Sequence, residues 1–194
     1  MGKIILVRHG ETELNVRGIY FGHMDPPLNE KGKNQAQKAM EILKDVDYDK
    51  IYTSDLSRAF ETASIVNHKK IELVSTESLR EINFGIFEGY SYKELQEKYP
   101  EELKASEDWR NYNYITGESV TEMQKRAIKF IDDVVNLDET TVLVSHWGPI
   151  NTILSYYISS GLDSYWKYSV ENGGVVVLEF SDGHPILKGF NIGG

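Results

Sequence analysis

A chain of 194 residues is long enough to bury one substantial hydrophobic core, so we expect a single domain over residues 1–194. Its 21 Lys and Arg against 30 Asp and Glu give a formal charge of −9, which disfavours binding to nucleic acid or an anionic membrane surface. The lack of cysteine excludes disulfides, thiolate nucleophiles and sulfur-ligated metals. No apolar stretch approaches the ~20 residues that span a bilayer, and the first residues lack the apolar core of a signal peptide, so we expect a cytoplasmic protein.

Five short apolar runs predict strands that are buried on both faces of a sheet. In chain order these runs are residues 4–7, 50–54, 71–75, 141–145 and 175–180, and residues 186–192 predict a further edge strand.

Three helix patterns lie between these runs, each with apolar residues on one face. The clearest opens at Ser119, which forms a capping-box pattern with Glu122 ahead of an apolar stripe that extends to Val134. Two others follow Asn29 and Ser57. Because strands alternate with amphipathic helices, we expect a three-layer α/β/α sandwich around a mostly parallel central sheet.

Residues 79–117 break this alternation. The segment is rich in aromatic side chains, among them Phe84, Phe87, Tyr90, Tyr92, Tyr99, Trp109, Tyr112 and Tyr114. We expect it to form an aromatic-rich cap over one end of the sheet, where its rings would select the substrate. The alternative is a helical packing insert that contacts no ligand.

Polar side chains follow three of the predicted strands at the point where each strand ends. Arg8 and His9 follow the first strand, Arg58 lies in the first turn after the second, and His146 follows residues 141–145. Ligands of parallel sheets bind beyond the carboxyl ends of the strands, so we expect these side chains and a helix N-terminus to meet in one crevice. Such a cluster favours a polyanion.

Arg8 and His9 need not carry like charges, although they are neighbours. Arginine stays protonated, whereas a histidine among arginines has its pKa lowered and remains neutral. A neutral imidazole is a nucleophile or a base. Phosphoryl transfer needs a nucleophile in line with the leaving group and fixed cations around the three equatorial oxygens, which this cluster would supply.

Four sequence blocks carry a family resemblance. They are Arg8-His9-Gly10-Glu11-Thr12, SDLSRAFET with Arg58, LREINFGIFEG with Glu81, and VSHWGPI with His146. In this order they resemble the motifs of the histidine phosphatase superfamily, in the branch with the cofactor-dependent phosphoglycerate mutases. The resemblance covers essentially the whole chain and implies a phosphohistidine enzyme that needs no metal and no other cofactor.

The resemblance also assigns roles to individual residues. It implies that His9 attacks phosphorus, and that Arg8, Asn15, Arg58 and His146 hold the phosphoryl oxygens. The resemblance also implies that the proton donor is Glu81. That carboxyl group would protonate the leaving oxygen and then deprotonate the hydrolytic water, and both steps need a raised pKa.

One position departs from the family pattern. Relatives usually place a glycine directly after the second histidine, and this chain has Trp147 there. We expect its backbone N–H to remain near the phosphate, while the indole either walls the pocket or stacks on an aromatic group of the substrate. Pro149 suits the first turn of the helix that follows.

Other roles for these residues stay open at this point. A surface ion pair with Asp55 or Glu61 is the alternative for Arg58. A satisfied hydrogen-bonding histidine is the alternative for His146, and Glu88 and Glu11 compete with Glu81 as the acid. The remaining histidines lie outside every block and are expected to be surface or packing residues: His23, His68 and His184.

The expected substrate is a small phosphomonoester, and the expected state is a monomer or homodimer. The sequence FGHMDPPLNEKG and the segment from LREINF to KEL look most like bacterial phosphatases of the alpha-ribazole phosphatase type. Relatives with similar blocks act as phosphoglycerate mutases, phosphoserine phosphatases or broad-specificity phosphatases.

Two other classes of protein stay open. One is a phosphate-binding module without turnover. The other is a metallohydrolase built on His9, Glu11 and His146, for which no HExxH spacing is present.

Overall fold

The computed structural model of the chain describes residues 2–159 and 161–194. Its centre is a six-stranded sheet in the order β3-β2-β4-β1-β5-β6. The neighbouring pairs from β3 to β1 are parallel, and β5 and β6 are antiparallel to their neighbours. The strands are β1 (Gly2–Arg8), β2 (Lys50–Ser54), β3 (Leu73–Thr76), β4 (Thr140–Ser145), β5 (Val175–Ser181) and β6 (His184–Ile192).

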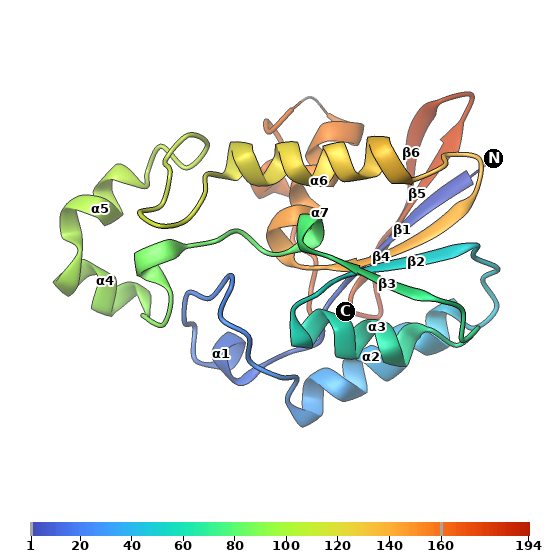
Figure 1. Cartoon of the computed structure of the whole chain (residues 1–194), viewed down its shortest axis with the longest axis horizontal. Helices are drawn as coiled ribbons and strands as arrows, with labels where there is room; N and C mark the ends of the chain where they lie inside the picture. Colours follow the sequence, from blue (N-terminus) through green and yellow to red (C-terminus); the bar gives the residue numbers. More distant parts are fainter. Residues whose placement is uncertain (1, 160) are drawn as a thin grey trace.

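Helices cover both faces of this sheet (Figure 1). Alternate residues of β1 point to opposite faces, so Ile4 and Leu6 join one core cluster while Ile5 and Val7 join the other. The first cluster includes residues of α6 (Val120–Val134) and α7 (Trp147–Ile158), and the second includes residues of α2 (Glu30–Leu43) and α3 (Ser57–Val66). The predicted three-layer sandwich with a mostly parallel sheet is therefore confirmed.

Local side-chain signals set where the predicted helices begin. Ser119 and Glu122 form both halves of the capping box at the start of α6, and Asn29 accepts a hydrogen bond from the Gly32 N–H at the start of α2. The third predicted helix, α3, begins at Ser57 without a side-chain cap. All three predicted helices are present.

The segment at residues 79–117 forms a cap at one end of the sheet. It contains η2 (Gly85–Phe87), α4 (Tyr92–Lys98) and α5 (Pro100–Ala105), follows η1 (Glu77–Leu79), and extends beyond the carboxyl ends of the parallel strands at the left of Figure 1. The short helices α1 (Glu13–Val16) and η3 (Tyr165–Lys167) belong to other connections. Phe87, Tyr99 and Tyr112 pack against one another inside the cap, as the packing alternative predicts.

The sequence interpretation of residues 71–75 as a strand buried on both faces was wrong. β3 begins at Leu73 and lies at the edge of the sheet, where it pairs only with β2. Among the described residues, no further strand pairs with the outer edge of β3, and Val74 is 41% exposed. A short apolar run looks the same at an edge as in the centre of a sheet, so periodicity alone could not separate the two.

Within the described ranges, no helix combines the length and the apolar character needed to cross a membrane.

Candidate active site

The two histidines of the sequence motifs lie side by side because β1 and β4 are paired in register. Arg8 is opposite Ser145 in the parallel ladder, so His9 and His146 follow at the same level. The His9 N–H donates to the Ser145 carbonyl at 2.9 Å. The two rings are almost fully buried, and their centroids are 5.0 Å apart.

The His9 ring is held as a neutral imidazole with one free nitrogen. Its Nδ1 lies 2.7 Å from the Gly10 carbonyl, which can only accept, so Nδ1 carries the proton and Nε2 carries the lone pair. Burial lowers the pKa of His9 well below its ordinary value of 6.5, and the charges of Arg58 and Arg8 lower this pKa further. Nε2 is therefore available as a nucleophile or base near neutral pH.

Arg58 is a fully buried cation at the start of α3. It donates to the carbonyls of Met24 at 2.8 Å and Gly22 at 2.7 Å, and its guanidinium lies 4.8 Å from the centre of the Phe21 ring. Burial lowers the pKa of Arg58 to about 10, which still leaves it protonated at neutral pH. On the opposite side, Arg8 Nη1 donates to the Val170 carbonyl at 2.6 Å.

Four buried nitrogens around His9 have no hydrogen-bond partner among the described residues. They are Arg8 Nε, Arg58 Nε, and both ring nitrogens of His146. Burying such groups without partners costs free energy, and buried polar groups in proteins are nearly always paired. Two of the four belong to guanidinium groups, so an anion is the natural partner.

Arg8, His9 and Arg58 line a cavity of about 220 Å³, whereas the buried His146 ring lies behind His9 and is not among its lining residues. Among its lining residues are Arg8, His9, Asn15, Arg58 and Glu81, so the structure brings five of the predicted site residues together. Asn15 is held by a capping box with Thr12, in which Asn15 Oδ1 accepts from the Thr12 N–H and hydroxyl. Its NH₂ group is thus the end left to donate to a ligand.

Glu81 lies partly buried at the edge of this cavity, on the segment that follows η1. Its carboxylate accepts from the N–H of Ile82 at 2.9 Å and from the N–H of Gly148 at 3.2 Å. Burial raises the pKa of Glu81 above its ordinary value of 4.5, although these hydrogen bonds and the nearby Arg58 and Arg8 charges oppose that rise. The carboxyl group is therefore more easily protonated than an exposed one.

Gly148 is a site residue that the sequence analysis missed. A Cβ at this position would overlap Glu81 Oε1 and lie 3.0 Å from Met123 Sδ, so a larger residue would displace the Glu81 carboxylate. The signal was present in the sequence SHWGPI, in which the expected glycine is displaced by one residue. Trp147 lies between His146 and Gly148 at the first position of α7.

The competing carboxylates are engaged elsewhere. Glu88 accepts from the backbone N–H groups of His23 and Met24, and Glu11 accepts from Asn29 and Lys31. Asp55 was one alternative ion-pair partner for Arg58. In the described contacts it pairs instead with Arg80, through two hydrogen bonds. Of the three carboxylates weighed for the acid role, Glu81 is the one that lines the cavity beside His9.

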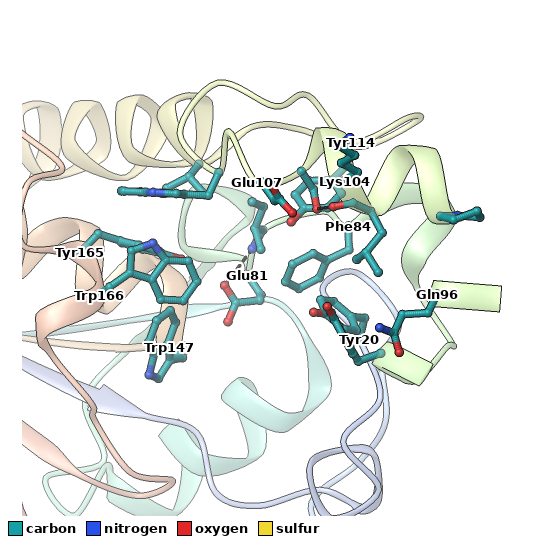
Figure 2. Close-up of a pocket in the computed structure, with 17 residues that line it drawn as sticks. Tyr20, Glu81, Phe84, Gln96, Lys104, Glu107, Tyr114, Trp147, Tyr165 and Trp166 are labelled. Carbon is teal, nitrogen blue, oxygen red and sulfur yellow. Dashed lines mark hydrogen bonds between the residues drawn. The ribbon is translucent and has the colours of Figure 1, made fainter. Parts of the chain in front are cut away.

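A second, larger cavity of about 820 Å³ opens beside the first. Both cavities share Tyr20, Glu81 and Phe84 in their linings, so Glu81 stands at the junction between them. Figure 2 shows Trp147 and Trp166 on one side of the Glu81 carboxylate and Tyr20 and Phe84 on the other. Trp147 thus lines the larger cavity, and Trp109 and Tyr114 of the cap line it too.

The raised pKa of Glu81 leads to a prediction about stability. Below the ordinary pKa the side chain is protonated in both the folded and unfolded states; as pH rises through the folded pKa, the buried carboxyl ionises and stability is lost. The side chain introduced by Glu81→Gln cannot ionise. We therefore expect the free energy of unfolding of this variant to increase relative to that of the parent protein as pH rises above 4.5. Urea unfolding of both proteins over a pH series measures this, and a difference independent of pH would contradict it.

Comparison with known proteins identifies the family. The model of the "Histidine phosphatase superfamily (branch 1)" matches residues 4–193. Phosphoserine phosphatase 1 of Hydrogenobacter thermophilus is 32% identical over 196 residues, covering 99% of this chain and 93% of that protein. Adenosylcobalamin/alpha-ribazole phosphatase of Salmonella typhimurium is 31% identical, covering 97% of this chain and 96% of that protein.

A solved structure extends this likeness to three dimensions. The crystal structure of the alpha-ribazole phosphatase from Shigella flexneri matches with a TM-score of 0.92 at 28% identity, covering 98% of this chain and 96% of that one. Within the described part of the chain, no group of three or more His, Asp or Glu side chains is arranged to hold a metal ion. The chain belongs to the histidine phosphatase superfamily, and the relatives named here are phosphoric monoester hydrolases.

Proposed function

We propose that this protein is a metal-independent phosphomonoesterase that works through a phosphohistidine at His9. The observation that carries the proposal is the neutral His9 ring, which lines a small cavity together with Arg8 and Arg58, each with an unpartnered Nε. In this proposal Arg8, Arg58, the Asn15 NH₂ group and one ring N–H of His146 donate to the phosphoryl oxygens. They stabilise the charge that spreads over those oxygens in the transition state.

The first step transfers the phosphoryl group to the enzyme. His9 Nε2 attacks phosphorus, the N–P bond forms and the P–O bond to the leaving group breaks. The protonated Glu81 carboxyl gives its proton to the leaving oxygen. Its place at the junction of the two cavities supports this role, because the leaving oxygen joins the phosphoryl group in the small cavity to the rest of the ester in the large one.

The second step returns the enzyme to its starting state. The Glu81 carboxylate takes a proton from a water molecule, the water oxygen attacks phosphorus, and the N–P bond breaks. His9 regains its lone pair and inorganic phosphate leaves. The raised pKa of Glu81 suits both steps, since the same group must donate in the first and accept in the second.

The large cavity supports a substrate with a flat ring system in the leaving group. Its volume of about 820 Å³ far exceeds what a seryl or glyceryl group fills, and aromatic side chains stand on both sides of Glu81. Among the described residues that line it, Lys104 is the one cation, and Glu107 offsets its charge. This balance does not favour a leaving group with a carboxylate, such as that of phosphoserine or a phosphoglycerate. We therefore propose an ester of the alpha-ribazole 5′-phosphate kind.

A substrate panel tests this preference. We expect kcat/KM to be highest for alpha-ribazole 5′-phosphate and lower for phosphoserine and both phosphoglycerates, with free phosphate as the product and no isomerised ester. Trp166 is 60% exposed, so Trp166→Ala can be made at little cost in stability. The variant should raise KM for the ring-bearing ester by about five- to tenfold and leave KM for phosphoserine nearly unchanged.

Two results would contradict the substrate assignment. One is a phosphoserine kcat/KM equal to or above that of the ring-bearing ester. The other is an equal effect of Trp166→Ala on both esters. Hydrolysis of p-nitrophenyl phosphate that is lost in excess EDTA would contradict the metal-independent chemistry itself.

A further inference from the structure

The carboxyl group of Glu81 lies on a segment with little regular structure of its own. Residues 80–84 connect η1 to η2 and belong to neither a helix nor a strand. A backbone without regular hydrogen bonds is free to shift, yet proton transfer to a leaving oxygen requires placement within hydrogen-bond reach. Contacts from other elements must therefore hold this segment in place, and they include the Gly148 N–H on the Glu81 carboxylate and the Glu118 N–H on the Asn83 carbonyl.

Arg126 of α6 makes the direct contacts to that segment. Its Nη2 donates to the backbone carbonyl of Glu81 at 2.9 Å, and its Nη1 donates to the backbone carbonyl of Ser78 at 2.9 Å. One rigid guanidinium thus joins two carbonyls three residues apart and ties both to a helix of 15 residues.

Glu118 completes the arrangement from the residues just before α6. Its carboxylate accepts from Arg126 Nε at 3.0 Å and Nη2 at 2.7 Å, and it also accepts from the backbone N–H of Asn83 at 3.1 Å. Arg126 and Glu118 therefore bind the segment on both sides of Glu81. The two side chains are mostly buried, with exposed fractions of 24% and 18%. Charge-assisted bonds of this kind are about twice as strong as neutral ones.

Neither member of this pair lines either of the two cavities described above. Both line a separate cleft of about 360 Å³, together with Arg80 and Asn83. Arg126 therefore does not act through contact with the ester, and its direct hydrogen bond to the Glu81 carbonyl links it to the proposed proton donor.

We propose that Arg126, held by Glu118, is a positioning residue that aims the Glu81 carboxyl group at the leaving oxygen. The inference rests on the proposed function, in which Glu81 is the proton donor. It makes a prediction that a general structural role does not make. Loss of Arg126 should slow the departure of leaving groups that need a proton far more than the departure of those that do not.

Leaving groups of different basicity test the proposal. The p-nitrophenolate ion is stable without protonation, whereas the alkoxide of β-glycerol phosphate must be protonated as it leaves. We expect Arg126→Met to lower kcat/KM for β-glycerol phosphate by about 10- to 100-fold, and for p-nitrophenyl phosphate by less than about threefold. The ratio kcat/KM is the quantity to compare, because it reports the steps up to the departure of the leaving group.

Matched variants separate positioning from loss of stability. Ile131→Val changes a core residue of the same helix, 1% exposed, and should leave the ratio of the two substrates at the parent value. Arg126→Lys keeps the charge but cannot reproduce the forked contacts, so its ratio should fall between parent and Arg126→Met. Glu81→Gln marks the full loss of proton donation.

The outcomes distinguish this inference from the function on which it rests. If Glu81→Gln shows the selective loss with β-glycerol phosphate but Arg126→Met lowers both substrates equally or neither, the positioning role is overturned and the phosphatase mechanism stands. If Glu81→Gln itself shows no selectivity, the assignment of the proton donor fails first. A selective loss in Arg126→Met that is absent in Ile131→Val supports the inference.

Discussion

We expect His9→Ala to lower phosphatase turnover by on the order of 10⁴-fold or more. The substitution removes Nε2, the free nitrogen in the small cavity. No other described side chain that lines this cavity combines a lone pair with a lowered pKa and an open path to the ligand. The measurement is release of phosphate from p-nitrophenyl phosphate, together with rapid-quench trapping of a radiolabelled ester.

The trapping experiment supplies the decisive contrast. The parent protein should give an adduct that is labile in acid and stable in alkali, as a phosphohistidine is, and His9→Ala should give none. His184 is exposed on β6, far along the chain from every motif, so His184→Ala serves as a control with parent activity. An adduct that persists in His9→Ala would place the covalent step on another residue.

For Arg58→Ala we expect kcat/KM to fall by about 100- to 1,000-fold. The guanidinium is fully buried, and its Nε is one of the unpartnered nitrogens beside His9, so it is preorganised for a phosphoryl oxygen. Vanadate takes the five-coordinate geometry of the transferring group, and its inhibition should weaken in parallel with the loss of rate. Steady-state rates and vanadate inhibition constants measure both effects.

Arg58→Lys helps to interpret that result. A lysine keeps a positive charge, but its three N–H donors sit on one nitrogen and cannot reproduce the planar fork that reaches the Gly22 and Met24 carbonyls from two nitrogens and leaves Nε for the ligand, so we expect it to rescue activity only in part. Arg17 is exposed at the end of α1, and Arg17→Ala should retain parent activity. A near-normal rate in Arg58→Ala would remove this arginine from the site.

The sequence predicted the sheet and the small cavity well, because both depend on local patterns. Apolar runs ending in Arg8, His9 and His146 mark the carboxyl ends of two neighbouring strands, and parallel pairing then brings those residues together. The capping box at Ser119 placed the start of α6 at the correct residue. The family resemblance supplied Glu81 and Asn15, which no periodicity identifies, and the structure places both at the same cavity.

Contacts between distant segments were beyond the reach of sequence patterns. Residues 79–117 could be recognised as aromatic-rich, but which rings face the cavity and which pack together depends on the three-dimensional path of the chain. Trp166 lies far from that segment in sequence and still lines the same cavity. The edge position of β3 and the link from Arg126 to Glu81 also depend on long-range packing, so neither leaves a local signature.

The unpartnered nitrogens around His9 also bear on how tightly the folded state is held. Folding removes these cationic and polar groups from water, and their dehydration is offset only when an anion arrives. A ligand that binds only the folded form raises the free energy of unfolding, by about 2.7 kcal/mol at a concentration 100 times its Kd. In the proposed reaction inorganic phosphate is the end product, and we expect it to be such a ligand. Accumulating product would thus protect the enzyme against heat while occupying the place of the next ester.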